Sequence, residues 1–198
     1  MVSDSEVIGV IPAAGRAARI SPLPCSKEIY PVGLRRTPDG ALRPKAACHY
    51  LLERMREAGI AKAYIVLRDG KWDIPAYLED GAAVGMQLAY LIADSVVGTP
   101  YTVDRARAFV ADANVAFGFP DMLLGSEDIF VRLLARQRES EADLILGSFP
   151  AEPGLAADLL DVDADGRVRR LSVGPPDARL QRTWGVAAWR PAFTEYLH

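Results

Sequence analysis

The chain has 198 residues, half of them hydrophobic and a quarter charged, a composition that excludes a disordered protein. Lys and Arg number 23 against 26 Asp and Glu, so the net charge of −3 excludes the strongly basic domain that nucleic-acid binding favours. No apolar run approaches the roughly 20 residues that span a bilayer, and the polar, acidic first residues are unlike a signal peptide. We therefore expect a cytoplasmic protein without nucleic-acid or membrane partners.

The first expected element is a buried strand at 7–11, a β-branched run that Pro12 ends. Residues 13–44 are rich in Gly, Pro, Arg and Ser and are expected to be one long irregular segment, which in a compact domain is usually functional. Apolar residues at helical spacing predict a helix over 45–58, and a second buried strand follows at 63–67. This order is the βαβ pattern of a parallel sheet.

The remaining chain continues the alternation. In chain order we expect a helix at 72–78, a strand at 86–92, a helix at 102–110, a strand at 113–117, a helix at 127–140 with Ser126 as its N-cap, a strand at 143–149, a hairpin of strands 159–163 and 167–171 around Asp165-Gly166, a strand at 184–189, and a last helix from Pro191.

This pattern predicts a single α/β domain over residues 1–198, with a Rossmann-like three-layer α/β/α fold. Its sheet should be mixed but mostly parallel, with a small antiparallel hairpin excursion near 155–175. The apolar face of the last helix is incomplete at His198, so we expect the chain to be truncated at its C-terminus. Cys25 and Cys48 match no metal-ligand spacing and are expected to be free thiols, and His49 is expected to be a surface or packing residue.

The junction after the first strand carries the clearest functional signal. The strand leads directly into the small residues Ala13-Ala14-Gly15, and the cations Arg16, Arg19 and Lys27 follow within a short window. A strand that ends in a tight loop of small residues and then offers several cations is suited to binding phosphate. A Walker loop is absent, and Gly9 and Gly15 do not match the spacing of the dinucleotide-binding fingerprint.

The segment resembles the N-terminal signature of the sugar-1-phosphate nucleotidyltransferases. That signature is roughly Ala-Ala/Gly-Gly-x-Gly-Thr-Arg-Leu-x-Pro, followed by Pro/Ser-Lys and then Leu-Pro-Val. The matching residues here are Ile11-Pro12-Ala13-Ala14-Gly15, Arg19, Pro22, Ser26-Lys27-Glu28 and Pro31-Val32. Ala17 and Ala18 replace the second Gly and the Thr of the family pattern.

The resemblance implies a reaction in which a phosphorylated acceptor attacks the α-phosphorus of a nucleoside triphosphate and expels pyrophosphate. Ala13, Ala14 and Gly15 would then bind the nucleotide through their backbone. Arg19 and Lys27 would be catalytic, with Arg19 holding the pyrophosphate and Lys27 beside the transferred phosphoryl group. The alternative is that Arg19 and Lys27 are ordinary solvated loop cations.

Two further positions follow from the resemblance. Gly98 matches a glycine that meets the nucleotide, although it equally suits an ordinary turn before a helix. Asp121, expected after a strand's carboxyl end, matches an aspartate that binds Mg²⁺ in the family, and the alternative is a turn or helix cap. We therefore expect Mg²⁺ as the cofactor, with Asp121 as its ligand.

The acceptor half of the pattern matches less well. Trp184 and Gly185 resemble a family strand beside the sugar and are the expected acceptor-binding residues. However, the family's Glu-Lys-Pro is replaced by residues 172–176, and no residue corresponds to its second metal-binding aspartate. The expected partners are a nucleoside triphosphate and a phosphorylated sugar or similar small molecule, and a homo-oligomer is left open. The rival hypothesis is a non-catalytic domain that binds nucleotides or nucleotide sugars.

Overall fold

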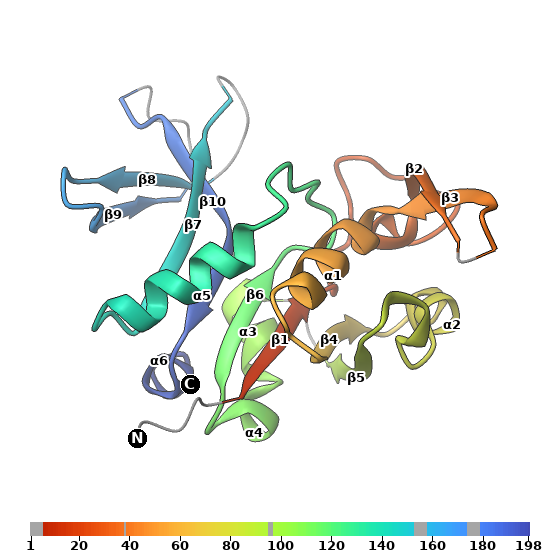
Figure 1. Ribbon diagram of the computed structural model, residues 1–198, viewed down its shortest axis with the longest axis horizontal. Helices are drawn as coiled ribbons and strands as arrows, with labels where there is room; N and C mark the ends of the chain where they lie inside the picture. Colours follow the sequence, from red (N-terminus) through yellow and green to blue (C-terminus); the bar gives the residue numbers. More distant parts are fainter. Residues whose placement is uncertain (1–5, 38, 95–96, 153–157, 174–178) are drawn as a thin grey trace.

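The computed structural model describes residues 6–37, 39–94, 97–152, 158–173 and 179–198. Within these ranges, eight strands form one mixed sheet in the order β5-β4-β1-β6-β10-β8-β9, with β7 also paired to β10 (Figure 1). The strands are β1 (Val7–Pro12), β4 (Lys62–Arg68), β5 (Gln87–Ala93), β6 (Asn114–Gly118), β7 (Leu144–Pro150), β8 (Leu159–Val162), β9 (Val168–Ser172) and β10 (Arg182–Trp189). Strands β5, β4, β1 and β6 run parallel, and β10 is antiparallel to β6, β7 and β8.

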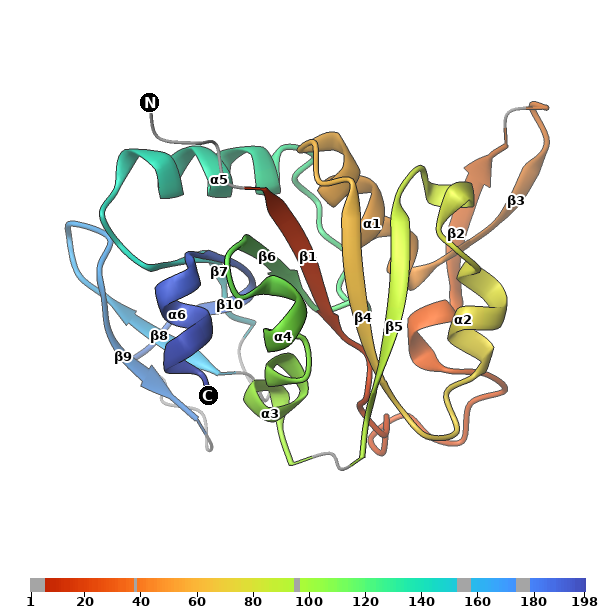
Figure 2. The same cartoon turned by 90° about the horizontal axis from the view of Figure 1, so that it is seen from below.

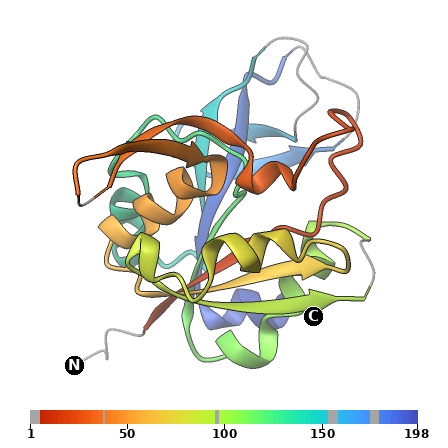
Figure 3. The same ribbon diagram turned by 90° about the vertical axis from the view of Figure 1, so that its right-hand side faces the viewer.

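Helices cover both faces of this sheet. Their bounds are α1 (Ala47–Glu57), α2 (Asp73–Leu78), α3 (Thr99–Asp104), α4 (Arg107–Val110), α5 (Ile129–Glu139) and α6 (Pro191–Tyr196), with short 3-10 turns η1 (Lys27–Ile29) and η2 (Ala82–Val84). The view onto the edge of the sheet separates α1 and α2 on one side from α4 and α6 on the other (Figure 3). The expected three-layer α/β/α fold is therefore confirmed.

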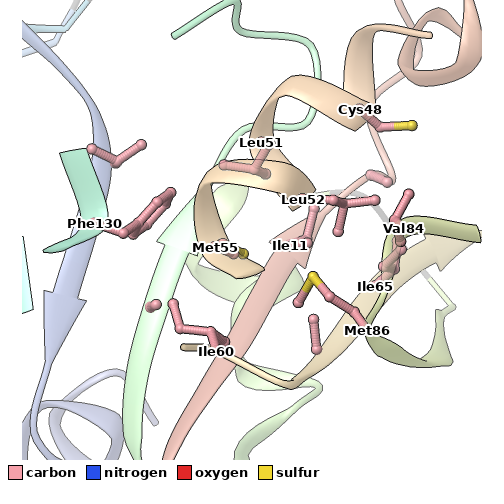
Figure 4. Close-up of a cluster of buried hydrophobic side chains, with 14 of the residues drawn as sticks. Ile11, Cys48, Leu51, Leu52, Met55, Ile60, Ile65, Val84, Met86 and Phe130 are labelled. Carbon is pink, nitrogen blue, oxygen red and sulfur yellow. The ribbon is translucent and has the colours of Figure 1, made fainter. Parts of the chain in front are cut away.

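The core consists of two hydrophobic clusters, one on each face of the sheet. On one face, Leu51, Leu52 and Met55 of α1 pack over Ile11 of β1, with Phe130 of α5 beside them (Figure 4). The other cluster joins β1, β6 and β10 to α3, α4 and α6. Continuous apolar strands such as β1 can be buried on both faces, and this burial is what the sequence pattern indicated.

The expectation that residues 13–44 are wholly irregular is wrong. This segment contains η1, and strands β2 (Pro31–Arg36) and β3 (Leu42–Ala46) form a separate antiparallel hairpin. Pro31 and Pro44 suggested a loop because proline cannot donate a ladder hydrogen bond, but an exposed hairpin edge tolerates it. Because Lys45 belongs to β3, helix α1 begins at Ala47 instead of at Lys45.

Two other helix predictions need correction. The helix expected at 102–110 is two short helices, α3 and α4, and α3 begins earlier, at Thr99. Between them the chain makes a turn in which the backbone N–H of Ala106 bonds to the Val103 carbonyl. Helix α5 begins at Ile129, and Ser126 does not cap it, because its hydroxyl donates to the Asp128 carboxylate instead.

The expected hairpin at Asp165-Gly166 is present as β8 and β9, and it extends the main sheet next to β10. Cys25 and Cys48 are both free thiols, and burial raises the pKa of Cys48 to about 12. Among the helices of the described ranges, none has the length and apolar character needed to cross a membrane.

Candidate active site

Residues 13–17, named the phosphate loop after their expected role, leave the carboxyl end of β1 alongside β4. The backbone N–H of Ala13 donates to the Val66 carbonyl at 2.8 Å, so the loop starts against the neighbouring strand. Ala13 and Ala14 are buried, and Gly15 is half-buried. The strand therefore leads into buried small residues before the loop reaches the surface.

Ala17 adopts a left-handed backbone conformation with a φ of +53°. Its carbonyl accepts bonds from the backbone N–H of Ile20 and from the Ser21 hydroxyl, at 3.0 and 3.1 Å. This conformation costs a residue with a Cβ about 1–2 kcal/mol. Ala17 stands where the nucleotidyltransferase signature has a glycine, so the loop keeps a glycine-like backbone without the glycine.

Ser26 directly precedes η1, which contains Lys27 and Glu28, and this segment is fixed from both sides. The backbone N–H and hydroxyl of Ser26 donate to the two Asp73 carboxylate oxygens at 2.7 and 2.8 Å. Burial alone would raise the pKa of Asp73, but these hydrogen bonds lower it below its ordinary value. The contact places η1 beside α2 (Figure 2).

Glu28 anchors the other side of η1. Its Oε1 accepts a bond from Lys71 Nζ at 2.6 Å, and the two side chains are only 2% and 4% exposed. Burial lowers the pKa of Lys71, although the Glu28 carboxylate acts in the opposite direction. With its two neighbours held in this way, Lys27 between them has a defined direction.

Lys27 points to Asp121. Lys27 Nζ donates to Asp121 Oδ2 at 2.6 Å, and the side chains are 24% and 33% exposed. Gly15 lies beside the Lys27 end of the pair, because a Cβ built on Gly15 would be 3.9 Å from both Lys27 Cε and Nζ. Three residues that the sequence proposed for separate roles therefore meet at one point.

Asp121 is suited to bind a Mg²⁺ ion whose other oxygen ligands come from the substrate and from water. It follows β6, its side chain is partly exposed, and its Oδ1 has no hydrogen-bond partner among the described residues. Mg²⁺ is commonly held by one or two carboxylates together with substrate phosphates and water. The part of the chain that the structure describes has no group of three or more acidic, His or Cys side chains that could hold a metal by itself.

Within the described ranges, no hydrogen bond or ion pair joins Arg19 or Gly98 to Gly15, Lys27 or Asp121. Arg19 is exposed on the turn after Ala17 and has no hydrogen-bond or ion-pair partner within the described ranges. Gly98 precedes α3, with a φ of +142°, and its carbonyl accepts bonds from the backbone N–H and hydroxyl of Thr102. Gly98 therefore stands at the start of α3, and its contact with a nucleotide stays a prediction.

The expected acceptor residues flank Asp121 from the side of β10. The ring of Trp184 lies 5.7 Å from that of Phe119, which is two residues before Asp121. Gly185 lies at an irregularity in the β10–β7 pairing, and a Cβ on it would clash with the end of the Met122 side chain. The loop that carries Asp121 thus packs directly on Trp184 and Gly185. Of the family's Glu-Lys-Pro region, residues 174–178 lie outside the described residues.

A cleft of about 280 Å³ opens beside the phosphate loop. Its lining includes the expected Gly15 and Lys27, together with Arg16, but Arg68 and Lys71 were missed in the sequence. Both come at or just after the carboxyl end of β4, so the reasoning applied to the first strand would have found them.

The site joins the loop after β1, for which the sequence predicts phosphate binding, to a carboxylate in the loop after the neighbouring strand β6, an arrangement suited to nucleotidyl transfer. No protein-family profile matches the chain. The chain is 28% identical over 160 residues to a glucose-1-phosphate thymidylyltransferase of Streptomyces antibioticus, a match that covers 78% of this chain and 44% of the relative. It is 24% identical over 174 residues to the low-salt glycan biosynthesis nucleotidyltransferase Agl11 of Haloferax volcanii, a match that covers 85% of this chain and 45% of the relative.

Two solved structures share the fold. One is a Bacillus anthracis protein assigned as a glucose-1-phosphate thymidylyltransferase in complex with sucrose, with a TM-score of 0.82, 13% identity, and coverage of 96% of this chain and 74% of that chain. The other is a UDP-glucose pyrophosphorylase complexed with UDP-glucose, with a TM-score of 0.76, 16% identity, and coverage of 97% and 79%. The resemblance to the sugar-1-phosphate nucleotidyltransferases is confirmed, and the chain spans less than half the length of the curated relatives it matches.

Proposed function

We propose that this chain is a nucleotidyltransferase domain, which transfers a nucleoside monophosphate from a nucleoside triphosphate to a sugar 1-phosphate or a similar phosphorylated acceptor. The observation that carries the proposal is the meeting of Gly15, Lys27 and Asp121, since Lys27 and Asp121 lie 94 positions apart in the sequence. The names of both curated relatives support an enzyme over a non-catalytic binding domain.

In the proposed reaction, a phosphate oxygen of the acceptor attacks the α-phosphorus and forms a new phosphorus–oxygen bond. The bond from the α-phosphorus to the oxygen that bridges it to the β-phosphorus breaks, and pyrophosphate leaves with that electron pair. The protein's contribution to such a step is positioning and charge stabilisation. Lys27 Nζ would stand beside the transferred phosphoryl group as a positive point charge.

The backbone of Ala13, Ala14 and Gly15 would contact the nucleotide, and Arg19 would reach in from the adjoining turn to the leaving pyrophosphate. Asp121 would hold Mg²⁺, which supplies positive charge to the phosphate oxygens when bound. The acceptor would lie on the side of Trp184 and Gly185, which flank the Asp121 loop. Gly98 would contact the nucleotide from the start of α3.

Pyrophosphate release tests this function. The protein is incubated with Mg²⁺, each of the common nucleoside triphosphates and a panel of sugar 1-phosphates. We expect release only when a triphosphate and an acceptor are both present, with loss of the reaction on chelation of the metal. Nucleotide binding by calorimetry without release for any pair would contradict the enzyme and favour a binding domain.

A further inference from the structure

The cleft beside the phosphate loop has a second cationic wall. Gly15, Arg16 and Lys27 line it from the segment after β1, and Arg68 and Lys71 line it from the end of β4 and the loop that follows, which form the second wall. The two groups line one cleft because β4 runs parallel to β1, with Pro12 paired to Val66. Arg68, two residues beyond Val66, therefore reaches the same edge of the sheet as the phosphate loop.

Among the described residues, two of these four cations form ion pairs with carboxylates, and the other two do not. Lys27 is paired with Asp121, and Lys71 is paired with Glu28. Asp73, the acidic residue in the cleft lining, already accepts two bonds from Ser26. Across the described ranges, Arg68 has no carboxylate within ion-pair distance, and neither has Arg16.

One hydrogen bond holds the guanidinium of Arg68 in place and leaves its other donors without a partner among the described residues. Its Nη1 donates to the carbonyl of Asp69 at 2.7 Å, and its Nε is buried without a hydrogen-bond partner. Its Nη2 is not buried in this way and has no hydrogen-bond partner among the described residues, so this end of the guanidinium can donate to an anionic ligand in the cleft that Arg68 lines. A planar guanidinium matches the oxygens of a phosphate better than an ammonium does.

We infer that Arg68 is a phosphate-binding residue, which takes the terminal phosphates of the nucleoside triphosphate from the second wall of the cleft. The inference rests on the proposed function for the identity of the ligand. The strand order β4-β1-β6-β10 sets Arg68 and Trp184 on opposite sides of the phosphate loop. Terminal phosphates at Arg68 and an acceptor at Trp184 would therefore flank the α-phosphorus from opposite sides, as in-line displacement requires.

Inorganic tripolyphosphate is a probe of this site that depends neither on the base nor on the acceptor. Its dissociation constant is measured by calorimetry for the wild-type chain and for Arg68→Gln, Arg68→Lys and Arg16→Gln. Arg136→Gln, on the exposed surface of α5, is the matched control for losing one positive charge. Thermal unfolding of each variant confirms that it is folded.

We expect Arg68→Gln to weaken tripolyphosphate binding by about 10- to 100-fold, the range for a lost hydrogen bond to a charged group. Arg68→Lys should recover part of the loss, and Arg136→Gln should stay within about 2-fold of the wild type, because exposed charges are screened. Binding by folded Arg68→Gln that equals the control overturns the inference, and so does a wild type that does not bind tripolyphosphate.

The outcomes separate this inference from the proposed function. A wild type that binds tripolyphosphate through Arg68 but releases no pyrophosphate with any substrate pair would contradict the enzyme and leave the phosphate site standing. Turnover by the wild type, with unchanged tripolyphosphate binding in Arg68→Gln, would contradict the role of Arg68 alone.

Discussion

Lys27 Nζ and Asp121 Oδ2 lie 2.6 Å apart although 94 positions separate the two residues in the chain. The contact joins the loop after β1 to the loop after β6, two strands that are neighbours in the sheet. An exposed ion pair of this kind contributes little to stability, about 0–1 kcal/mol. Its position beside Gly15 therefore matters for chemistry more than for folding.

Lys27→Gln and Asp121→Asn should each reduce turnover by an amount that corresponds to about 2–4 kcal/mol of transition-state stabilisation. Steady-state kinetics of pyrophosphate release measures the loss, and thermal unfolding should stay close to that of the wild type. The matched control is Lys62→Gln, whose ammonium pairs with Glu6 near the other end of β4. Full turnover in either active-site variant would remove its residue from the mechanism.

Arg19→Ala tests a role that the structure leaves as a prediction. If Arg19 reaches the leaving pyrophosphate only in the substrate complex, its removal should cost about 2–4 kcal/mol in kcat/KM without altering the free energy of unfolding. Its neighbour Arg16, which lines the cleft, provides the comparison. Loss of activity in Arg16→Ala but not in Arg19→Ala would transfer the assigned role to Arg16.

The buried Glu28–Lys71 pair should be sensitive to removal of one partner. Lys71→Met leaves the Glu28 carboxylate buried without its cation, and such changes cost about 3–5 kcal/mol. The double variant Glu28→Met with Lys71→Met should lose less than the sum of the single variants, because no uncompensated charge remains. Urea unfolding measures all three, and additive losses would contradict a coupled pair.

The exposed Lys62–Glu6 pair is the control for that experiment. Its side chains are 50% and 55% exposed, so Lys62→Met should change the free energy of unfolding by no more than about 1 kcal/mol. A loss as large as that of Lys71→Met would show that burial is not the cause of the difference.

Ala17→Gly should relieve the left-handed backbone at this position. The relief of about 1–2 kcal/mol is partly offset by the greater conformational freedom of glycine in the unfolded chain, about 0.5–1 kcal/mol. Ala18→Gly only increases the conformational freedom of the unfolded chain, because Ala18 is not among the described residues with a positive φ and has no such strain to relieve. Chemical denaturation should therefore find the Ala17 variant the more stable of the two, and the reverse order would contradict strain at Ala17.

His49 should make stability depend on pH. Its side chain is 1% exposed, and burial, with repulsion from Arg35 as a smaller cause, lowers its pKa to about 4. The unfolded chain takes up a proton near its ordinary pKa of about 6.5, so the contribution is complete above that pH and is lost as the pH falls toward 4. Between pH 7 and pH 5 this linkage amounts to roughly 2 kcal/mol.

Urea unfolding at pH 7 and pH 5 checks the His49 prediction. The wild type and His198→Gln, which changes an exposed histidine, should both lose stability at the lower pH. His49→Gln should lose about 2 kcal/mol less over the same interval. Equal losses in all three proteins would assign the pH dependence to the carboxylates.

Much of the fold could be predicted because its strands are continuous apolar runs. Strands such as β1, β4 and β6 stand within one or two residues of their expected positions, since burial on both faces demands uninterrupted hydrophobic sequence. The β2–β3 hairpin was missed because its residues are mostly exposed and contain Pro31 and Pro44. A solvated hairpin has no such hydrophobic signature.

The sequence by itself determined the local part of the site: the strand that ends in Ala13-Ala14-Gly15, and the Ser26-Lys27-Glu28 segment that follows. These are short-range features, because size limits and motif spacing act between residues close in the chain. Only the tertiary structure decided that Lys27 meets Asp121 and that Arg68 and Arg16 line one cleft. Those contacts depend on which strands are neighbours in the sheet, and hydrophobic patterning indicates that a strand is buried without indicating which strand lies beside it.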